Sequence, residues 1–415
     1  MTRIIHTGDT HLGYRQYHSP ERRGDFLDAF RAVVDDAIDA EVEALVHAGD
    51  LFHDRTPGLE DLMGTIDVLR ELDAAGIPFL AVVGNHEGTR TAQWLDLLES
   101  LGLAERLGYE PRVVGETAFY GQDYVPEAER DALDYDFEPA DTECTALVAH
   151  GAFTPFAHAS WETEEILASS PVDFDAVLLG DNHHPDRDTI EETLVTYCGS
   201  TERASAAERE DRGYNLVRFG SDAESGAIRL SRRGLDTRPF VFLDVELEAG
   251  EGESVVRERL REETVEDAVV VITLTGAGER VPPAELERFG RDRGALVVRV
   301  NDRREVEETD EDTQVSFADP DEAVRERVRE MGLSEAARSI DESVRGELAD
   351  SNVRDAVEEE VRELVEGDLE AFEDADGDAE TADASDGTDA DSGDDPDAGA
   401  EDDGADSQVT MGDYS

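Results

Sequence analysis

The stretch that decides the fold is RIIHTGDTH, residues 3–11. Its first half is apolar and β-branched and predicts a buried strand. A glycine follows, and then two side chains that can hold a metal ion, Asp9 and His11. Polar loops at the carboxyl ends of strands are where α/β sheets place their ligand sites. The stretch therefore predicts an α/β fold with a site at its first loop.

Four further strand-like segments end in loops of the same kind. The segments are EALVHAGD, PFLAVVGNHE, TALVAHG and AVLLGDNHH. The metal-capable side chains in their loops are Asp50, Asn85, His86, His150, Asp181 and His183. Any one loop is ordinary turn chemistry. Five in one domain predict a shared site, because the carboxyl ends of parallel strands meet at one edge.

The chemistry of these side chains favours a pair of divalent ions. Two ions roughly 3.5–4 Å apart can clamp a phosphate and activate a water molecule. A bridging position needs a carboxylate with two oxygens, which suits Asp50. Asn85 offers a neutral carbonyl oxygen, which limits the negative charge around an anionic substrate. Mixed imidazole and carboxylate donors favour Mn²⁺, Fe²⁺ or Zn²⁺ over Mg²⁺.

Helix-like segments alternate with these strands and predict parallel strands with helices on both faces. We expect this domain at 1–236 and a smaller α/β unit at 237–301. A polar linker is expected at 302–318. Residues 319–372 have the apolar spacing of short amphipathic helices, which either dock on a partner or form a small bundle of their own. The acidic segment 373–415 has almost nothing to bury and is expected to be disordered.

The charge balance is extreme. The chain carries 104 acidic residues against 37 basic ones, a net charge of −67, and it contains no lysine. Since the acid is spread along the whole chain, we favour adaptation to molar salt, where the Debye length is about 3 Å. The alternative is an acidic interaction protein. In molar salt the net charge says little about nucleic-acid binding, because counterion release contributes little.

The two cysteines and the absence of an apolar span set the expected compartment. Cys144 and Cys198 lie far apart in the sequence and are expected to be reduced core thiols. No signal peptide and no transmembrane run is apparent in the sequence. We therefore expect a cytoplasmic protein that does not bind a membrane.

The loop motifs resemble those of a known family. D-x-H, G-D, G-N-H-E, H-G and a final loop close to G-H-x-H are typical of the calcineurin-like metallophosphoesterases. HTGDTHLGYRQY, GDLFHD, GNHE and YCGSTERASAAERE are similar to the DNA-repair nucleases called meiotic recombination eleven and to their bacterial counterpart SbcD. The resemblance implies an α/β metallophosphoesterase sandwich, a small α/β capping domain and a C-terminal helical docking segment.

The resemblance also implies a role for each loop residue. The first ion would be held by Asp9, His11, Asp50 and His183. The second ion would be held by Asp50, Asn85, His150 and Asp181. His86 would not bind metal but would act on the phosphate, as a proton donor or by stabilising the transition state. His53, three residues after Asp50, is a candidate phosphate contact.

The final loop departs from the family pattern. Aligned without a gap, Asp181 replaces the first histidine of G-H-x-H, and His183 matches the second. We favour this register because aspartate also binds Mn²⁺. The alternative register uses His183 and His184 and leaves Asp181 outside the site.

The function implied by the resemblance is a DNA nuclease with two Mn²⁺ per subunit. Family members act on DNA ends as 3′-to-5′ duplex exonucleases and as single-strand endonucleases. They work with the coiled-coil ABC ATPase Rad fifty and form homodimers. Two rival functions stay open, a DNA-end-bridging scaffold with a restrained nuclease and a phosphoesterase for small substrates.

Overall fold

The computed structural model describes residues 1–89, 92–222 and 226–304. The expected linker from residue 305 onward, the expected helices at 319–372 and the expected tail at 373–415 lie outside these residues. Among the described helices, none is both long enough and apolar enough to cross a lipid bilayer.

The first sheet contains the strand of the opening stretch. Its strand order is β12-β11-β1-β2-β3-β4. The strands are β1 (Thr2–Thr7), β2 (Ala44–His47), β3 (Phe79–Ala81), β4 (Glu105–Arg106), β11 (Gly213–Asp222) and β12 (Gly226–Gly234). Strands β1 to β4 run parallel, whereas β11 pairs antiparallel with both β1 and β12. The carboxyl ends of β1, β2 and β3 therefore share one edge.

The second sheet has the order β5-β6-β7-β8-β10-β9. Its strands are β5 (Arg112–Val114), β6 (Thr117–Gln122), β7 (Cys144–His150), β8 (Ala176–Gly180), β9 (Asp186–Ile190) and β10 (Thr193–Tyr197). The four inner strands are parallel, and the two edge strands β5 and β9 are antiparallel to their neighbours.

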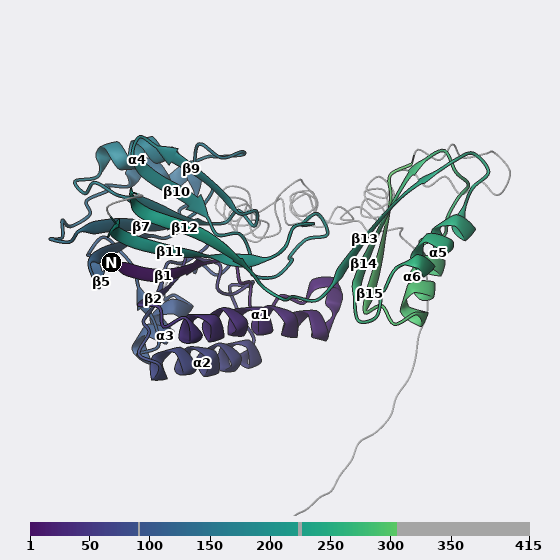
Figure 1. Ribbon diagram of the computed structural model, residues 1–415, viewed down its shortest axis with the longest axis horizontal. Helices are drawn as coiled ribbons and strands as arrows, with labels where there is room; N and C mark the ends of the chain where they lie inside the picture. The colour runs from purple at the N-terminus through teal and green to yellow at the C-terminus, as the bar shows by residue number, and fades with distance from the viewer. Residues whose placement is uncertain (90–91, 223–225, 305–415) are drawn as a thin grey trace, which may run out of the picture. The chain divides into compact units, whose positions relative to one another are not determined.

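The two sheets pack face to face. The core between them includes Ile4 and Val46 from the first sheet and Val148 and Leu178 from the second. The outer face of the first sheet is covered by α1 (Pro20–Asp39), α2 (Leu59–Ala74) and α3 (Trp94–Ser100) (Figure 1). The outer face of the second packs against the short α4 (Thr163–Ser169) and long loops. The expectation of helices on both faces of one sheet is wrong, since each sheet gives one face to the other.

Short 3₁₀ turns lie in two connections of this sandwich. They are η1 (Gln16–His18), just before α1, and η2 (Glu127–Ala132), between β6 and β7. Helix α1 begins at Pro20, because Ser19 accepts a hydrogen bond from the amide of Arg22 and Pro20 occupies the first turn.

A third sheet follows the sandwich. It consists of the parallel strands β13 (Phe240–Leu247), β14 (Val269–Gly276) and β15 (Val297–Asp302). Helices α5 (Glu253–Glu262) and α6 (Pro283–Asp292) pack on it (Figure 1) and contribute Val256, Leu260 and Leu286 to its core. These strands and helices lie in the segment where the small α/β unit was expected, and β15 ends one residue past the expected end of that segment.

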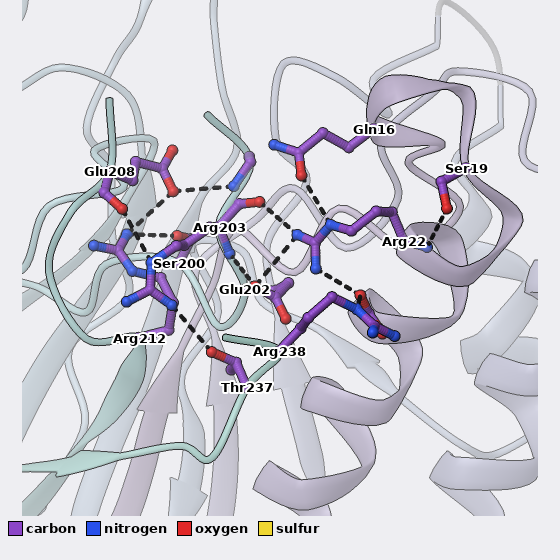
Figure 2. A network of polar contacts seen from close by, with 12 residues as sticks. Gln16, Ser19, Arg22, Ser200, Glu202, Arg203, Glu208, Arg212, Thr237 and Arg238 are labelled. Atoms are coloured by element: carbon purple, nitrogen blue, oxygen red, sulfur yellow. Dashed lines mark hydrogen bonds and ion pairs between the residues drawn. The ribbon is translucent and has the colours of Figure 1, made fainter. Parts of the chain in front are cut away.

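Ion pairs join α1 to the start of β13. Arg238 pairs with both carboxylate oxygens of Asp25 at 2.6 and 2.8 Å. Arg22, which is fully buried, also donates to Asp25 and lies over the ring of Phe240 at 5.0 Å. Figure 2 shows Arg22 and Arg238 close to each other. This junction ties the start of the third sheet to helix α1.

Candidate metal centre

Five loops converge at the carboxyl ends of β1, β2, β3, β7 and β8. Within the described residues, three triads have donor atoms within 4.8 Å of one another. The triads are Asp9 with His11 and His183, Asp9 with Asp50 and His150, and His11 with His53 and His86. The structure therefore brings the residues of these triads together in one cluster, in which Asp9, His11, Asp50 and His150 are buried.

Asp50 lies at the middle of the cluster. Its Oδ2 is 3.9 Å from Nε2 of His11 and 3.5 Å from Nε2 of His150. Its Oδ1 accepts a hydrogen bond of 3.0 Å from the amide of His86. One carboxylate thus faces donors on both sides, which is the arrangement that a bridging ligand needs.

On one side of Asp50, the possible metal ligands lie around the ring of His150. Its Nδ1 donates to the carbonyl of Ala48 at 2.7 Å, which leaves Nε2 as the atom that faces the cluster. This Nε2 lies 3.0 Å from Oδ1 of Asn85, 3.5 Å from Asp50 and 3.6 Å from Oδ1 of Asp181. Three oxygens and one imidazole nitrogen therefore converge where the second ion was expected.

His11 and His183 face each other on the other side. Their Nε2 atoms are 2.9 Å apart. Asp9 accepts from the amide of Asp181 through Oδ1 at 2.9 Å, while its buried Oδ2 has no hydrogen-bond partner among the described residues. Paired imidazole nitrogens beside a buried carboxylate oxygen that lacks a partner form a donor set that fits a divalent cation.

The final loop separates Asp181 from His184. Asp181 points its carboxylate toward His150, as described above. His184 is 55% exposed and its Nδ1 lies 2.6 Å from Glu210 at the surface. His184 belongs to none of the triads that the described residues form. Asp181 therefore faces the cluster, whereas His184 faces Glu210 at the surface.

Aromatic rings line the cluster beside His11. The His86 ring centroid is 4.8 Å from that of His11, and Nδ1 of His86 donates to the carbonyl of His53 at 2.9 Å. The His53 ring stacks on Tyr14 at 3.8 Å. His86 and His53 thus present their rings to the same space, each held by a neighbour.

The electrostatics of the cluster favour added positive charge. Burial alone would raise the pKa of Asp50, but His150 and His11 hold it well below its usual range. Burial would lower the pKa of His183, yet Glu208 and Asp9 raise it to about 9. Burial raises the pKa of Asp9 to about 6. Bound cations would replace these protons.

Glycines before the ligands allow the loops to approach. A Cβ on Gly84 would lie 2.0 Å from Oδ1 of Asp50 and 2.3 Å from its backbone nitrogen. Gly49 has φ of +88°, and a Cβ there would lie 2.5 Å from Nδ1 of His150. Neither position accepts a larger residue without displacing a donor.

Three important residues were not predicted from the sequence. Glu87 is buried and accepts hydrogen bonds from the amides of Phe52 and Gly84, so it joins two loops. Glu208 and Arg212 hold the final loop. Glu208 lies within the quoted stretch YCGSTERASAAERE, but nothing in its spacing pointed to the cluster.

The chain matches known proteins over most of its length. Residues 2–217 match the calcineurin-like phosphoesterase family. The chain is 64% identical over 361 residues to the DNA double-strand break repair protein Mre11 of Haloferax volcanii, covering 86% of this chain and 81% of that protein. It is 61% identical over 360 residues to the same-named protein of Halobacterium salinarum, covering 86% and 93%. The Mre11 protein of Methanosarcina acetivorans is 43% identical over 373 residues, covering 86% and 59%.

Proposed function

Because the chain belongs to the calcineurin-like phosphoesterases and, within them, to the Mre11 family of DNA double-strand break repair proteins, we propose that it is a Mn²⁺-dependent nuclease that processes broken DNA ends. The observation that carries the proposal is the convergence of donors on both sides of Asp50. A phosphoesterase site of this composition suits a phosphodiester substrate.

The residues present would hold two ions. Asp9, His11, Asp50 and His183 would hold the first. Asp50, Asn85, His150 and Asp181 would hold the second. The ions would supply Lewis-acid activation of the phosphate and of a water molecule. With three carboxylates in the set, two divalent ions still leave a net positive charge to attract the phosphodiester.

We propose Mn²⁺ as the ion, from the group of Mn²⁺, Fe²⁺ and Zn²⁺ that the donor set favours over Mg²⁺. The set mixes imidazole nitrogens with carboxylate and amide oxygens, and it contains no thiolate. Cys198 lies below the loops with its Sγ 3.6 Å from the carbonyl of Leu179, so it faces the backbone. Such mixed nitrogen and oxygen sites suit Mn²⁺ better than Mg²⁺, which prefers oxygen alone.

His86 would act on the substrate phosphate. Its Nδ1 proton is committed to the carbonyl of His53, so Nε2 is the atom available to the substrate. A proton on Nε2 would pass to the departing oxygen or offset the charge that develops on the phosphate. His53, held by Tyr14, would contact the same phosphate from the neighbouring ring position.

The reaction we propose is 3′-to-5′ removal of nucleotides from duplex ends and endonuclease cleavage of single strands. DNA ends are thus the proposed substrate. The partner we propose is a Rad fifty type ATPase that binds residues 319–372, whose apolar spacing suits a docking segment. Deleting these residues is expected to abolish co-purification with the ATPase and to leave Mn²⁺ binding intact.

We also propose that the protein forms a homodimer through α2 and α3. Leu59 and Met63 on α2 are 73% and 56% exposed, and they lie four residues apart on one helix face. Leu97 and Leu101, at α3 and its end, repeat this spacing and are also exposed. Four large apolar side chains on two helices of one sheet face mark an interaction surface.

The test is cleavage of a linear duplex in molar KCl with Mn²⁺ titrated from zero. Substrates labelled at the 3′ or the 5′ end report the polarity of shortening. We expect Mn²⁺-dependent cleavage from the 3′ end, and no cleavage by Asp50→Ala. Cleavage that persists in folded Asp50→Ala, or no cleavage by the wild type with its ATPase partner present, would contradict the proposal.

A further inference from the structure

We infer that Glu208 and Arg212 form a clamp that positions His183, with Glu208 acting on the ring and Arg212 on the backbone. The inference rests on the proposed function in one respect, since it takes His183 as a ligand of the first ion. Neither residue touches the reacting atoms, so both are positioning residues.

The ring contact fixes which nitrogen of His183 faces the cluster. Nδ1 of His183 lies 2.8 Å from Oε1 of Glu208. A carboxylate can only accept here, so Nδ1 carries a proton and Nε2 is the atom left to offer a lone pair to a metal ion. That Nε2 is the atom that faces Nε2 of His11 at 2.9 Å. Carboxylates that orient a ligand histidine in this way strengthen metal binding.

Glu208 is itself held in place. Its second oxygen accepts from the amide of Ala204 at 3.0 Å and from Nη1 of Arg212 at 3.2 Å. Only 12% of its side chain is exposed. A carboxylate with both oxygens engaged has one orientation, so the ring it binds has one as well.

Arg212 holds the same histidine from its backbone. The side chain is 2% exposed, and Nη1 donates to the carbonyl of His183 at 3.0 Å and to Oγ of Ser200 at 3.1 Å. Figure 2 shows Arg212 and Glu208 facing each other, with Ser200 beside them. The ring and the carbonyl of His183 are therefore fixed by two groups that also bind each other.

The adjacent residue supplies a contrast. His184 pairs with Glu210 at 2.6 Å, and both side chains are 55% exposed. The pair has the same chemistry as His183 with Glu208, but it lies at the surface and joins no donor triad among the described residues. Exposed pairs of this kind contribute little. Glu210 is therefore a matched control for Glu208.

The experiment compares Glu208→Gln with Glu210→Gln in the full-length protein. Calorimetric titration with Mn²⁺ measures the affinities of both sites. We expect Glu208→Gln to weaken one of the two sites by roughly 10–100-fold and to leave the other unchanged. Glu210→Gln should leave both unchanged. In the metal-free protein, imidazole ¹⁵N spectra should show His183 protonated at Nδ1 in the wild type and altered only in Glu208→Gln.

Wild-type affinities at both sites in folded Glu208→Gln, together with an unaltered His183 spectrum, would overturn the clamp. If Glu208→Gln does not fold, Arg212→Met takes its place, because methionine has no N–H to donate to the His183 carbonyl or to Glu208. Unchanged affinities in Arg212→Met would also overturn the clamp. The proposed nuclease activity is tested separately. A wild-type protein that binds two Mn²⁺ but does not cut DNA would refute the nuclease, and the Mn²⁺ titration of Glu208→Gln would still test the clamp.

Discussion

At the residue scale, the ligand loops hold their side chains in an unusual backbone conformation. Asp9, His11, Asp50 and Asp181 all have positive φ, between 44° and 97°. For residues other than glycine this region costs roughly 1–2 kcal/mol each. Strain of this kind persists where the surroundings fix it, and it gathers at functional sites. Four strained residues in one cluster mark that cluster as the functional part of the sandwich.

In the final loop, we expect substitution of Asp181 to weaken Mn²⁺ binding and substitution of His184 to leave it unchanged. Asp181→Ala removes an oxygen that lies 3.6 Å from Nε2 of His150, so the second Mn²⁺ should bind more weakly by over an order of magnitude. His184→Ala removes an exposed ring and should change neither site. Calorimetric titration with Mn²⁺ checks both. Full affinity in Asp181→Ala with a loss in His184→Ala would show that the shifted register is correct.

Gly84 should tolerate no side chain. In Gly84→Ala the new Cβ would meet the Asp50 carboxylate at 2.0 Å and displace the central ligand, so both Mn²⁺ sites and cleavage should be lost. Gly24→Ala is the control, since nothing lies within 4 Å of a Cβ there. Mn²⁺ titration and thermal unfolding measure the two variants. Wild-type Mn²⁺ binding by Gly84→Ala would refute this packing.

The sequence predicted which side chains gather at the sheet edge better than it predicted the residues that support them. Asp9, His11, Asp50 and His150 follow strands directly, so their place in the chain indicates their place at the sheet edge. Glu87 and Glu208 act through backbone amides and through another side chain. Such contacts depend on loop conformation, which residue type and spacing do not determine.

At the scale of elements, the sequence predicted the core strands and the long helices but not the second layer. The hydrophobic runs of β1, β2, β7 and β8 are buried on both faces, which suits one sheet between helices as well as two stacked sheets. Strand β9 was missed because its side chains are mostly exposed and charged. The resemblance of the loops, and not periodicity, pointed to a sandwich.

The β1–β2 pair makes stability depend on pH. His6 on β1 and His47 on β2 are fully buried, and burial lowers the pKa of each to about 3. In the unfolded chain each takes up a proton near pH 6.5. Below that pH the unfolded state binds more protons, so stability falls as the pH drops from about 6.5 toward 3. Each histidine contributes a slope of about 1.4 kcal/mol per pH unit.

His47→Gln tests this dependence. Between pH 6 and pH 4 this variant should take up about one proton fewer on unfolding. The slope of its unfolding free energy against pH should therefore fall by about 1.4 kcal/mol per pH unit. The double variant that also carries His6→Asn should take up about two protons fewer than the wild type. Denaturant titrations in molar KCl with a chelator measure the slopes. Slopes equal to the wild type in both variants would mean that these histidines do not titrate on unfolding.

At the scale of the whole molecule, the dimer surface predicts how the chain assembles. Met63→Asp combined with Leu97→Asp places charge in the apolar surface of α2 and α3 and should produce monomers. Val113→Asp, at a 46% exposed apolar position on β5, should not change the oligomeric state. Light scattering after gel filtration in molar KCl gives the masses. A dimer that survives the double substitution would place the interface elsewhere.

The acidic, lysine-free composition is also a property of the whole molecule, and we interpreted it as adaptation to molar salt. Relatives at 64% and 61% identity come from Haloferax and Halobacterium, which agrees with the salt-adapted interpretation. Many arginines of the described residues are tied into ion pairs, as Arg238 is with Asp25 and Arg209 with Asp244. The charge therefore reports the solvent for which the surface is built and not the partner.

The most direct test of the two-ion site is a crystal structure of the protein grown with Mn²⁺ and measured at the manganese absorption edge. We expect two anomalous peaks per subunit, both bound to Asp50. One should touch His183, and the other should touch His150 and Asp181. A single peak, or a second peak bound by His184 with Asp181 turned away, would contradict the two-ion site described above.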